Sequence, residues 1–105
     1  MLEIKYKKDL EEIADKLGYE EQSMQLIEEM AELTQAINKN RRYNTYETKC
    51  NIIEEIADVC IVLSQVAHLL KVNERVFDAY VEEKIERTKK RIAKCGKNIE
   101  KGVER

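Results

Sequence analysis

Proline is absent from this chain, and glycine occurs only at Gly18, Gly96 and Gly102. The tight turns between β-strands depend on proline, glycine and asparagine-glycine pairs, so this composition nearly excludes a sandwich or a barrel. An all-α fold is therefore predicted. Because the chain has 105 residues, we expect one domain that covers residues 1–105.

The spacing of the apolar residues predicts four helices. Their approximate ranges are 1–18, 24–37, 48–71 and 74–96, with a polar connection at 41–47 and a frayed basic tail at 97–105. Gly18 is expected to end the first helix, and Thr45 or Thr48 could cap the third. Asn73 is expected to cap the fourth helix.

The third predicted helix is apolar on nearly all sides. A helix of this kind is buried on nearly all sides, and the three other helices of so small a chain cannot surround it completely. We therefore expect a four-helix bundle-like protomer. It would assemble through the third helix into a homodimer or a homotetramer.

Charge is distributed unevenly along the chain. Residues 1–83 carry 18 acidic and 10 basic side chains, whereas residues 84–105 carry 9 basic and 3 acidic ones. The net charge of −2 argues against a nucleic-acid partner. Either the basic end only neutralises the acidic body, or its lysines and arginines bind an anion.

No membrane partner is expected. The longest apolar run, residues 59–63, falls far short of the roughly 20 residues that span a bilayer. The first residues also lack the pattern of a signal peptide, so we expect a soluble, cytoplasmic protein.

Two pairs of acidic residues stand three positions apart, Glu29 with Glu32 and Glu55 with Asp58. Each pair shares one face of its helix. If the second and third helices pack antiparallel, four carboxylates meet across the groove between them. Their mutual repulsion then requires a hard cation such as Mg²⁺, with Mn²⁺ as the alternative. Histidine and cysteine are too sparse here to supply a nitrogen or sulfur site.

The pentapeptide Glu-Glu-Ile-Ala-Asp occurs twice, ending at Asp15 and at Asp58, so this motif alone does not locate a site. The helical neighbourhood separates the two copies. The face that holds Asp15 also carries lysines, which indicates a solvated surface, whereas the face of Glu55 and Asp58 also carries valines. Acids on an inward apolar face need compensation. A cation could supply it, or ion pairing with Lys84 or Arg87.

Residues 28–32 form the motif Glu-Glu-x-x-Glu, and a basic connection and the motif Glu-x-x-Asp at 55–58 on a long apolar helix follow. This arrangement resembles the MazG-type nucleoside triphosphate pyrophosphohydrolases. The likeness extends from about Gly18 to Arg91 and includes the basic helix that comes last. Enzymes of this family cleave a nucleoside triphosphate between the α- and β-phosphates, giving the monophosphate and pyrophosphate, with Mg²⁺ held by the acids. The resemblance implies the same all-α fold, activity and metal for this chain.

The resemblance also implies roles for individual residues. Metal ligands would be Glu29, Glu32, Glu55 and Asp58, the residue that orients or deprotonates the attacking water would be Glu28, and the phosphate-binding residues would be Lys84, Arg87 and Arg91. Thr88 departs from the family pattern, in which asparagine is frequent at that position. Gln22 and Gln25 lie on the carboxylate face of their helix and could contact the edge of a base.

A non-catalytic, homo-oligomeric adaptor is the alternative function. It leaves the inward placement of Glu55 and Asp58 unexplained. The single histidine, His68, lies about 220° around the helix from Glu55, so a packing or interface role is expected for it rather than a catalytic one.

Overall fold

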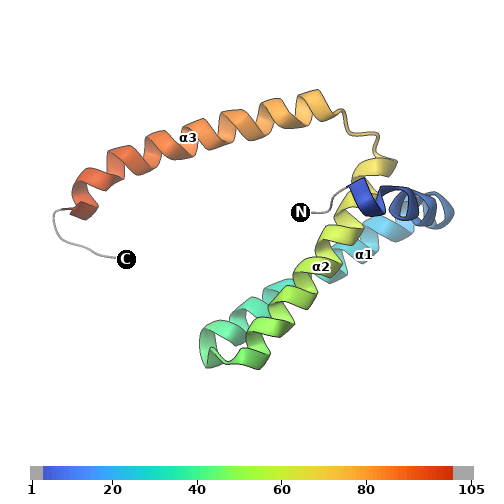
Figure 1. Cartoon of the computed structure of the whole chain (residues 1–105), viewed down its shortest axis with the longest axis horizontal. Helices are drawn as coiled ribbons and strands as arrows, with labels where there is room; N and C mark the ends of the chain where they lie inside the picture. The colour runs from blue at the N-terminus through green and yellow to red at the C-terminus, as the bar shows by residue number, and fades with distance from the viewer. Residues whose placement is uncertain (1–3, 101–105) are drawn as a thin grey trace. The chain divides into compact units, whose positions relative to one another are not determined.

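The protein is all-α, as its composition predicts. The computed structural model describes residues 4–100, with side-chain burial for residues 5–96. Its elements are a short 3₁₀ helix η1 (Ile4–Tyr6) and three α-helices, α1 (Lys7–Tyr43), α2 (Tyr46–Leu69) and α3 (Glu74–Glu100) (Figure 1). They form two compact units, one with η1, α1 and α2 and the other with α3. The four-helix bundle stays a prediction.

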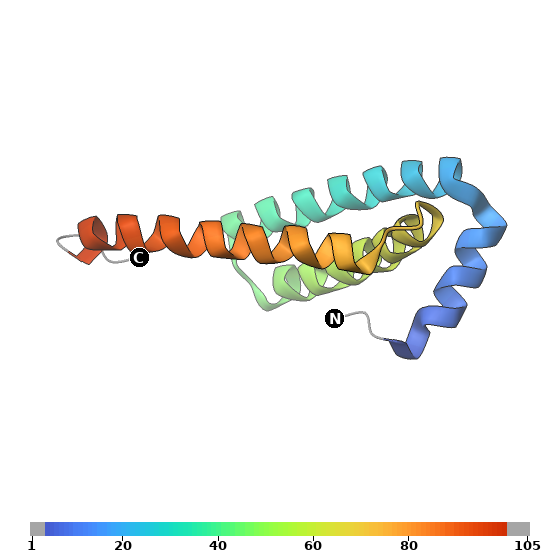
Figure 2. The same ribbon diagram turned by 90° about the horizontal axis from the view of Figure 1, so that it is seen from above.

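Gly18 divides α1 into two helical segments. Its φ of 86° and ψ of 165° are not helical, and the helix axis turns sharply at this point (Figure 2). Side chains with a Cβ atom rarely adopt this combination of angles. The break predicted at Gly18 is therefore confirmed, and the first two predicted helices correspond to the two segments of α1.

The second segment of α1 is longer than the sequence pattern predicts. It continues through Tyr43, and α2 begins at Tyr46, so only Asn44 and Thr45 connect the two helices. Asn44 ends α1 in the left-handed conformation with φ of 47°, and its N–H donates to the Asn40 carbonyl at 2.7 Å. The polar residues after Asn40 that suggested a loop, Arg41 and Arg42, are compatible with a helix because arginine is a good helix former.

Hydrogen bonds fix the start of α2 against the end of α1. The side chains of Thr45 and Thr48 form a reciprocal capping box at the N-terminus of α2. The Asn40 amide donates to Thr48 Oγ1 at 2.8 Å, from α1 to α2. These bonds set the register of an antiparallel helical hairpin, in which α1 and α2 lie side by side (Figure 1).

A narrow row of small residues forms the core of the hairpin. The most buried apolar side chains are Ala14, Ala36, Val62 and Val66. The two valines lie on the stripe of α2 that was predicted to point inward, so that prediction is confirmed. Two glutamines, Gln22 and Gln65, are also buried, at 1% and 3% exposed.

The first segment of α1 is held against the end of α2 by His68. Its Nε2 lies 2.9 Å from Asp15 Oδ1, and its Nδ1 lies 3.6 Å from Glu11 Oε2. The packing role expected for His68 is observed. The face of Asp15 is not only solvated, because this carboxylate, although 65% exposed, reaches the histidine of the neighbouring helix.

Helix α3 starts at the predicted cap, since Asn73 Oδ1 accepts from the backbone N–H groups of Arg75 and Val76. It does not end near Gly96 but continues through Glu100. The rest of the predicted tail, residues 101–105, lies outside the described residues. Among the helices that the structure describes, none combines the length and apolar character needed to cross a bilayer.

Replacing Gly18 by alanine is expected to destabilise the protein by about 1–3 kcal/mol, because φ of 86° with ψ of 165° is strained for any residue with a Cβ atom. No heavy atom lies within 4 Å of the added methyl group, so backbone strain is the only cost. Gly96→Ala is the matched control, because Gly96 is helical and has equally open surroundings. That change should raise stability by up to about 1 kcal/mol. Urea denaturation checks both, and equal effects of the two changes would contradict the assignment of a kink.

Candidate metal centre

Three carboxylates converge between α1 and α2. Glu29 and Glu32 come from α1 and Glu55 comes from α2, and one oxygen of each lies within 4.8 Å of those of the other two. Glu29 and Glu55 are half-buried, whereas Glu32 is exposed. The antiparallel hairpin thus brings both predicted acidic motifs to one place.

Two oxygens of this cluster are buried without a hydrogen-bond partner, Glu29 Oε1 and Glu55 Oε1. The other oxygen of Glu29 accepts a long hydrogen bond of 3.4 Å from the Gln25 side chain. An unpaired buried carboxylate oxygen is costly, and a cation removes that cost. Carboxylate oxygens in this number fit Mg²⁺ or Mn²⁺, hard cations that keep further positions for water or phosphate.

The electrostatics of the cluster agree with this fit. The negative charge of Glu29 is the largest cause that raises the pKa of Glu32, followed by partial burial and the charge of Glu55. Partial burial is the largest cause that raises the pKa of Glu55, followed by the charges of Asp58 and Glu29. Glu32 and Glu55 are therefore harder to ionise than usual, and a cation would offset the charges that raise their pKa.

The fourth predicted ligand, Asp58, is half-buried on α2, one turn beyond Glu55. It is not among the three carboxylates that converge within 4.8 Å, but its charge contributes to the raised pKa of both Glu32 and Glu55. Glu28, predicted to act on the attacking water, is exposed on α1 beside Glu29.

The remaining predicted residues lie in different surroundings. Gln25 is half-buried and bonded to Glu29, whereas Gln22 is 1% exposed and its Oε1 has no hydrogen-bond partner. The predicted phosphate-binding residues lie on α3, the second unit, and all are exposed: Lys84, Arg87 and Arg91.

Burial distinguishes the two copies of the repeated pentapeptide. Glu55 is half-buried in the carboxylate cluster, whereas its counterpart Glu12 is exposed. Because the two copies have the same five residues, only their helical neighbours separate them. Two polar residues that the sequence analysis assigned no role, Lys39 and Asn51, continue the faces of Glu32 and Glu55 toward the turn. Their spacing of seven and four residues from these acids is a signal that could have identified them.

Without metal, the stability of the protein is expected to increase as the pH falls from 7 toward 4.5, the ordinary pKa of Glu32 and Glu55. The pKa of both carboxyls is raised in the folded state. Their contribution to stability is therefore fully present below 4.5 and is lost as the pH rises through the raised values. The double variant Glu32→Gln, Glu55→Gln should be more stable than the unmodified chain at pH 7, and this difference should narrow at low pH.

Urea denaturation in EDTA measures this difference. Saturating Mg²⁺ should reverse the order at pH 7, because a ligand that binds only the folded state raises its stability. If the difference in stability between the double variant and the unmodified chain did not change with pH, the three carboxylates would not repel one another.

Comparison with known protein families matches the part of the chain that carries the carboxylate cluster. A family model described as the MazG nucleotide pyrophosphohydrolase domain matches residues 17–92, which include the carboxylate cluster, all of α2 and most of α3. No curated protein and no solved structure matches the chain. The family match covers well over half of the sequence and both acidic motifs. The chain therefore belongs to the MazG nucleotide pyrophosphohydrolase family.

Proposed function

We propose that this protein is a Mg²⁺-dependent nucleoside triphosphate pyrophosphohydrolase that converts ribo- or deoxyribonucleoside triphosphates to monophosphates and pyrophosphate. The observation that carries the proposal is the convergence of Glu29, Glu32 and Glu55 with two buried oxygens that have no hydrogen-bond partner. Membership of the MazG family supports the reaction class. An adaptor without a ligand would leave those oxygens uncompensated.

In this proposal Glu29, Glu32 and Glu55, with Asp58 one turn away, hold the cation. A divalent cation there would neutralise triphosphate charge and make a water more acidic. The exposed carboxylate of Glu28 then accepts the proton of the water that attacks the α-phosphorus. The bond from the α-phosphorus to the bridging oxygen breaks, and its electron pair leaves with pyrophosphate.

Phosphate binding by Lys84, Arg87 and Arg91 is part of the proposal. Their exposed cations on α3 are chemically suited to a triphosphate, whose negative charge exceeds what one divalent cation can neutralise. Gln25 is proposed to orient Glu29 through its hydrogen bond. Base contacts by Gln22 and Gln25 remain a prediction.

Glu55→Gln and Asp58→Asn are each expected to lower kcat/KM for a triphosphate by at least about 100-fold, because each change removes a charge that the cation needs. The folded state without metal should be as stable as before or more so, since repulsion decreases. Pyrophosphate release with a panel of ribo- and deoxyribonucleoside triphosphates measures the activity.

Glu12→Gln is the matched control, because Glu12 occupies the same place in the other copy of the pentapeptide and is exposed. Asp15 would be a poor control because it contacts His68. If Glu12→Gln and Glu55→Gln reduced hydrolysis equally, the cluster would not be the catalytic site.

We also propose that the protein is a homo-oligomer that assembles through α2, as a dimer or a tetramer. A face of α2 about 80° to 180° around the helix from the buried Val62 carries apolar residues at heptad spacing, among them Ile53, Leu63 and Leu70. These three are 66%, 51% and 56% exposed. A second copy that packs on this face would remove a continuous apolar stripe from water.

Leu63→Asp is expected to convert the assembly to monomers while most helical content is retained, because Leu63 lies outside the core of the hairpin. Val62→Asp should unfold the hairpin, since Val62 is 5% exposed. Analytical ultracentrifugation and circular dichroism distinguish the two results. A well-folded monomer of the unmodified chain at micromolar concentration would contradict the proposed assembly through α2.

A further inference from the structure

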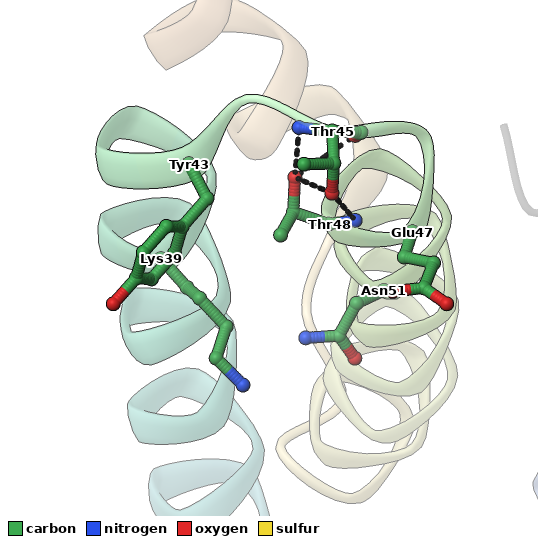
Figure 3. A pocket seen from close by; sticks show the side chains of 6 residues that line it. All are labelled: Lys39, Tyr43, Thr45, Glu47, Thr48 and Asn51. Atoms are coloured by element: carbon green, nitrogen blue, oxygen red, sulfur yellow. Dashed lines mark hydrogen bonds between the residues drawn. The ribbon is translucent and has the colours of Figure 1, made fainter.

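An open cavity of about 470 Å³ lies between the end of α1 and the start of α2. Its lining consists of Lys39, Tyr43, Thr45, Glu47, Thr48 and Asn51 (Figure 3). The volume is within the range of about 300–1,000 Å³ that is typical of small-molecule sites. All six residues belong to the helical hairpin that also carries the carboxylate cluster.

Two nitrogen-bearing side chains enter this cavity from opposite sides. Lys39 reaches in from α1 and Asn51 from α2, and their polar ends approach each other in the space between the helices (Figure 3). Among the described residues, Lys39 takes part in no salt bridge. The cavity therefore offers an ammonium group and an amide whose hydrogen-bonding capacity is available to a ligand.

Neither the two threonines nor the glutamate of the cavity occupies these donors. Thr45 and Thr48 are bonded to each other in the capping box, and Thr48 also accepts from Asn40. The carboxylate of Glu47 points to the outer side of α2, away from Lys39 (Figure 3). The inner surface of the cavity is thus suited to an anion.

The cavity lies nearer the turn than the carboxylate cluster, on the same faces of α1 and α2. Lys39 follows Glu32 by seven residues on the same face of α1, a rise of about 10 Å. Asn51 precedes Glu55 by four residues on the same face of α2, a rise of about 6 Å. A ligand bound at the three carboxylates through a cation would therefore find Asn51 about one helical turn from Glu55, and the backbone of Lys39 about two turns from Glu32.

We propose that this cavity binds the β- and γ-phosphates of the substrate, the part that leaves as pyrophosphate, and that Lys39 and Asn51 are their hydrogen-bond donors. The inference rests on the proposed function. The α- and γ-phosphorus atoms of a triphosphate lie apart by about the 5.4 Å of one helical turn, close to the rise from Glu55 to Asn51. The backbone of Lys39 is further from the cluster, but its side chain extends toward Asn51 (Figure 3). A nucleoside is uncharged and gains little from an ammonium group, whereas pyrophosphate gains charge as the bond to the α-phosphorus breaks.

Lys39→Ala tests this assignment, and Lys49→Ala is the matched control. Lys49 carries the same charge on the same hairpin, is exposed and does not line the cavity. The binding of inorganic pyrophosphate and of a nucleoside monophosphate, each with Mg²⁺, is measured by titration calorimetry. The value of kcat/KM is measured with the corresponding triphosphate, and circular dichroism checks the fold.

Lys39→Ala should weaken pyrophosphate binding and lower kcat/KM by at least about tenfold each, because a charge-assisted contact to phosphate is lost. Asn51→Ala should reduce both by a smaller factor, and Lys39→Arg should restore part of the loss. Binding of the monophosphate should change by less than about twofold, and Lys49→Ala should change every quantity by less than about twofold, since an exposed charge acts only through a screened field.

Several results would overturn the assignment. Equal weakening of monophosphate and pyrophosphate binding by Lys39→Ala would place the α-phosphate or the nucleoside in the cavity instead. Equal effects of Lys39→Ala and Lys49→Ala would mean that a diffuse basic field acts there.

If the unmodified chain hydrolyses triphosphates while Lys39→Ala leaves both pyrophosphate binding and hydrolysis unchanged, this inference fails and the proposed function stands. If the unmodified chain shows neither hydrolysis nor pyrophosphate binding with Mg²⁺ or Mn²⁺, the proposed function fails as well.

Discussion

The α1–α2 hairpin holds three carboxylates close enough to repel one another. One carboxylate oxygen each of Glu29, Glu32 and Glu55 lies within 4.8 Å of those of the other two, and the pKa of Glu32 and of Glu55 is raised. A folded chain keeps such a cluster at a cost in stability. A cation bound there would convert this cost into affinity, because the unpaired buried oxygens of Glu29 and Glu55 would be its ligands.

The short turn between α1 and α2 makes this convergence possible. Asn44 ends one helix, the capping box of Thr45 and Thr48 starts the next, and Asn40 bonds across to Thr48. Because the turn fixes the register of the two helices, each residue of α1 that lies further from the turn faces a defined residue of α2. The core of the hairpin consists of small alanines and valines, and the carboxylate cluster and the Lys39 cavity follow one another toward the turn.

Periodicity and capping rules predicted much of the fold. The break at Gly18, the cap at Asn73, the cap of α2 and the inward stripe of Val62 and Val66 are local properties of the sequence, and the structure contains all of them. The end of α1 was predicted too early, because residues 41–43 are compatible with both helix and loop. Which state they adopt depends on the left-handed Asn44 and on the bond from Asn40 to Thr48, and these involve the neighbouring helix.

Local sequence patterns are enough to establish that this chain is helical, where most helices begin, and which copy of Glu-Glu-Ile-Ala-Asp points inward, since each depends on neighbours within about two turns. Three features come instead from the packing of α1 against α2: Glu55 lies closer to Glu29 and Glu32 than Asp58 does, His68 contacts Asp15, and a cavity opens beside Lys39. These outcomes depend on the register of two antiparallel helices. A shift along the axis by one residue moves side chains by about 1.5 Å and rotates the face by about 100°, which no local pattern specifies.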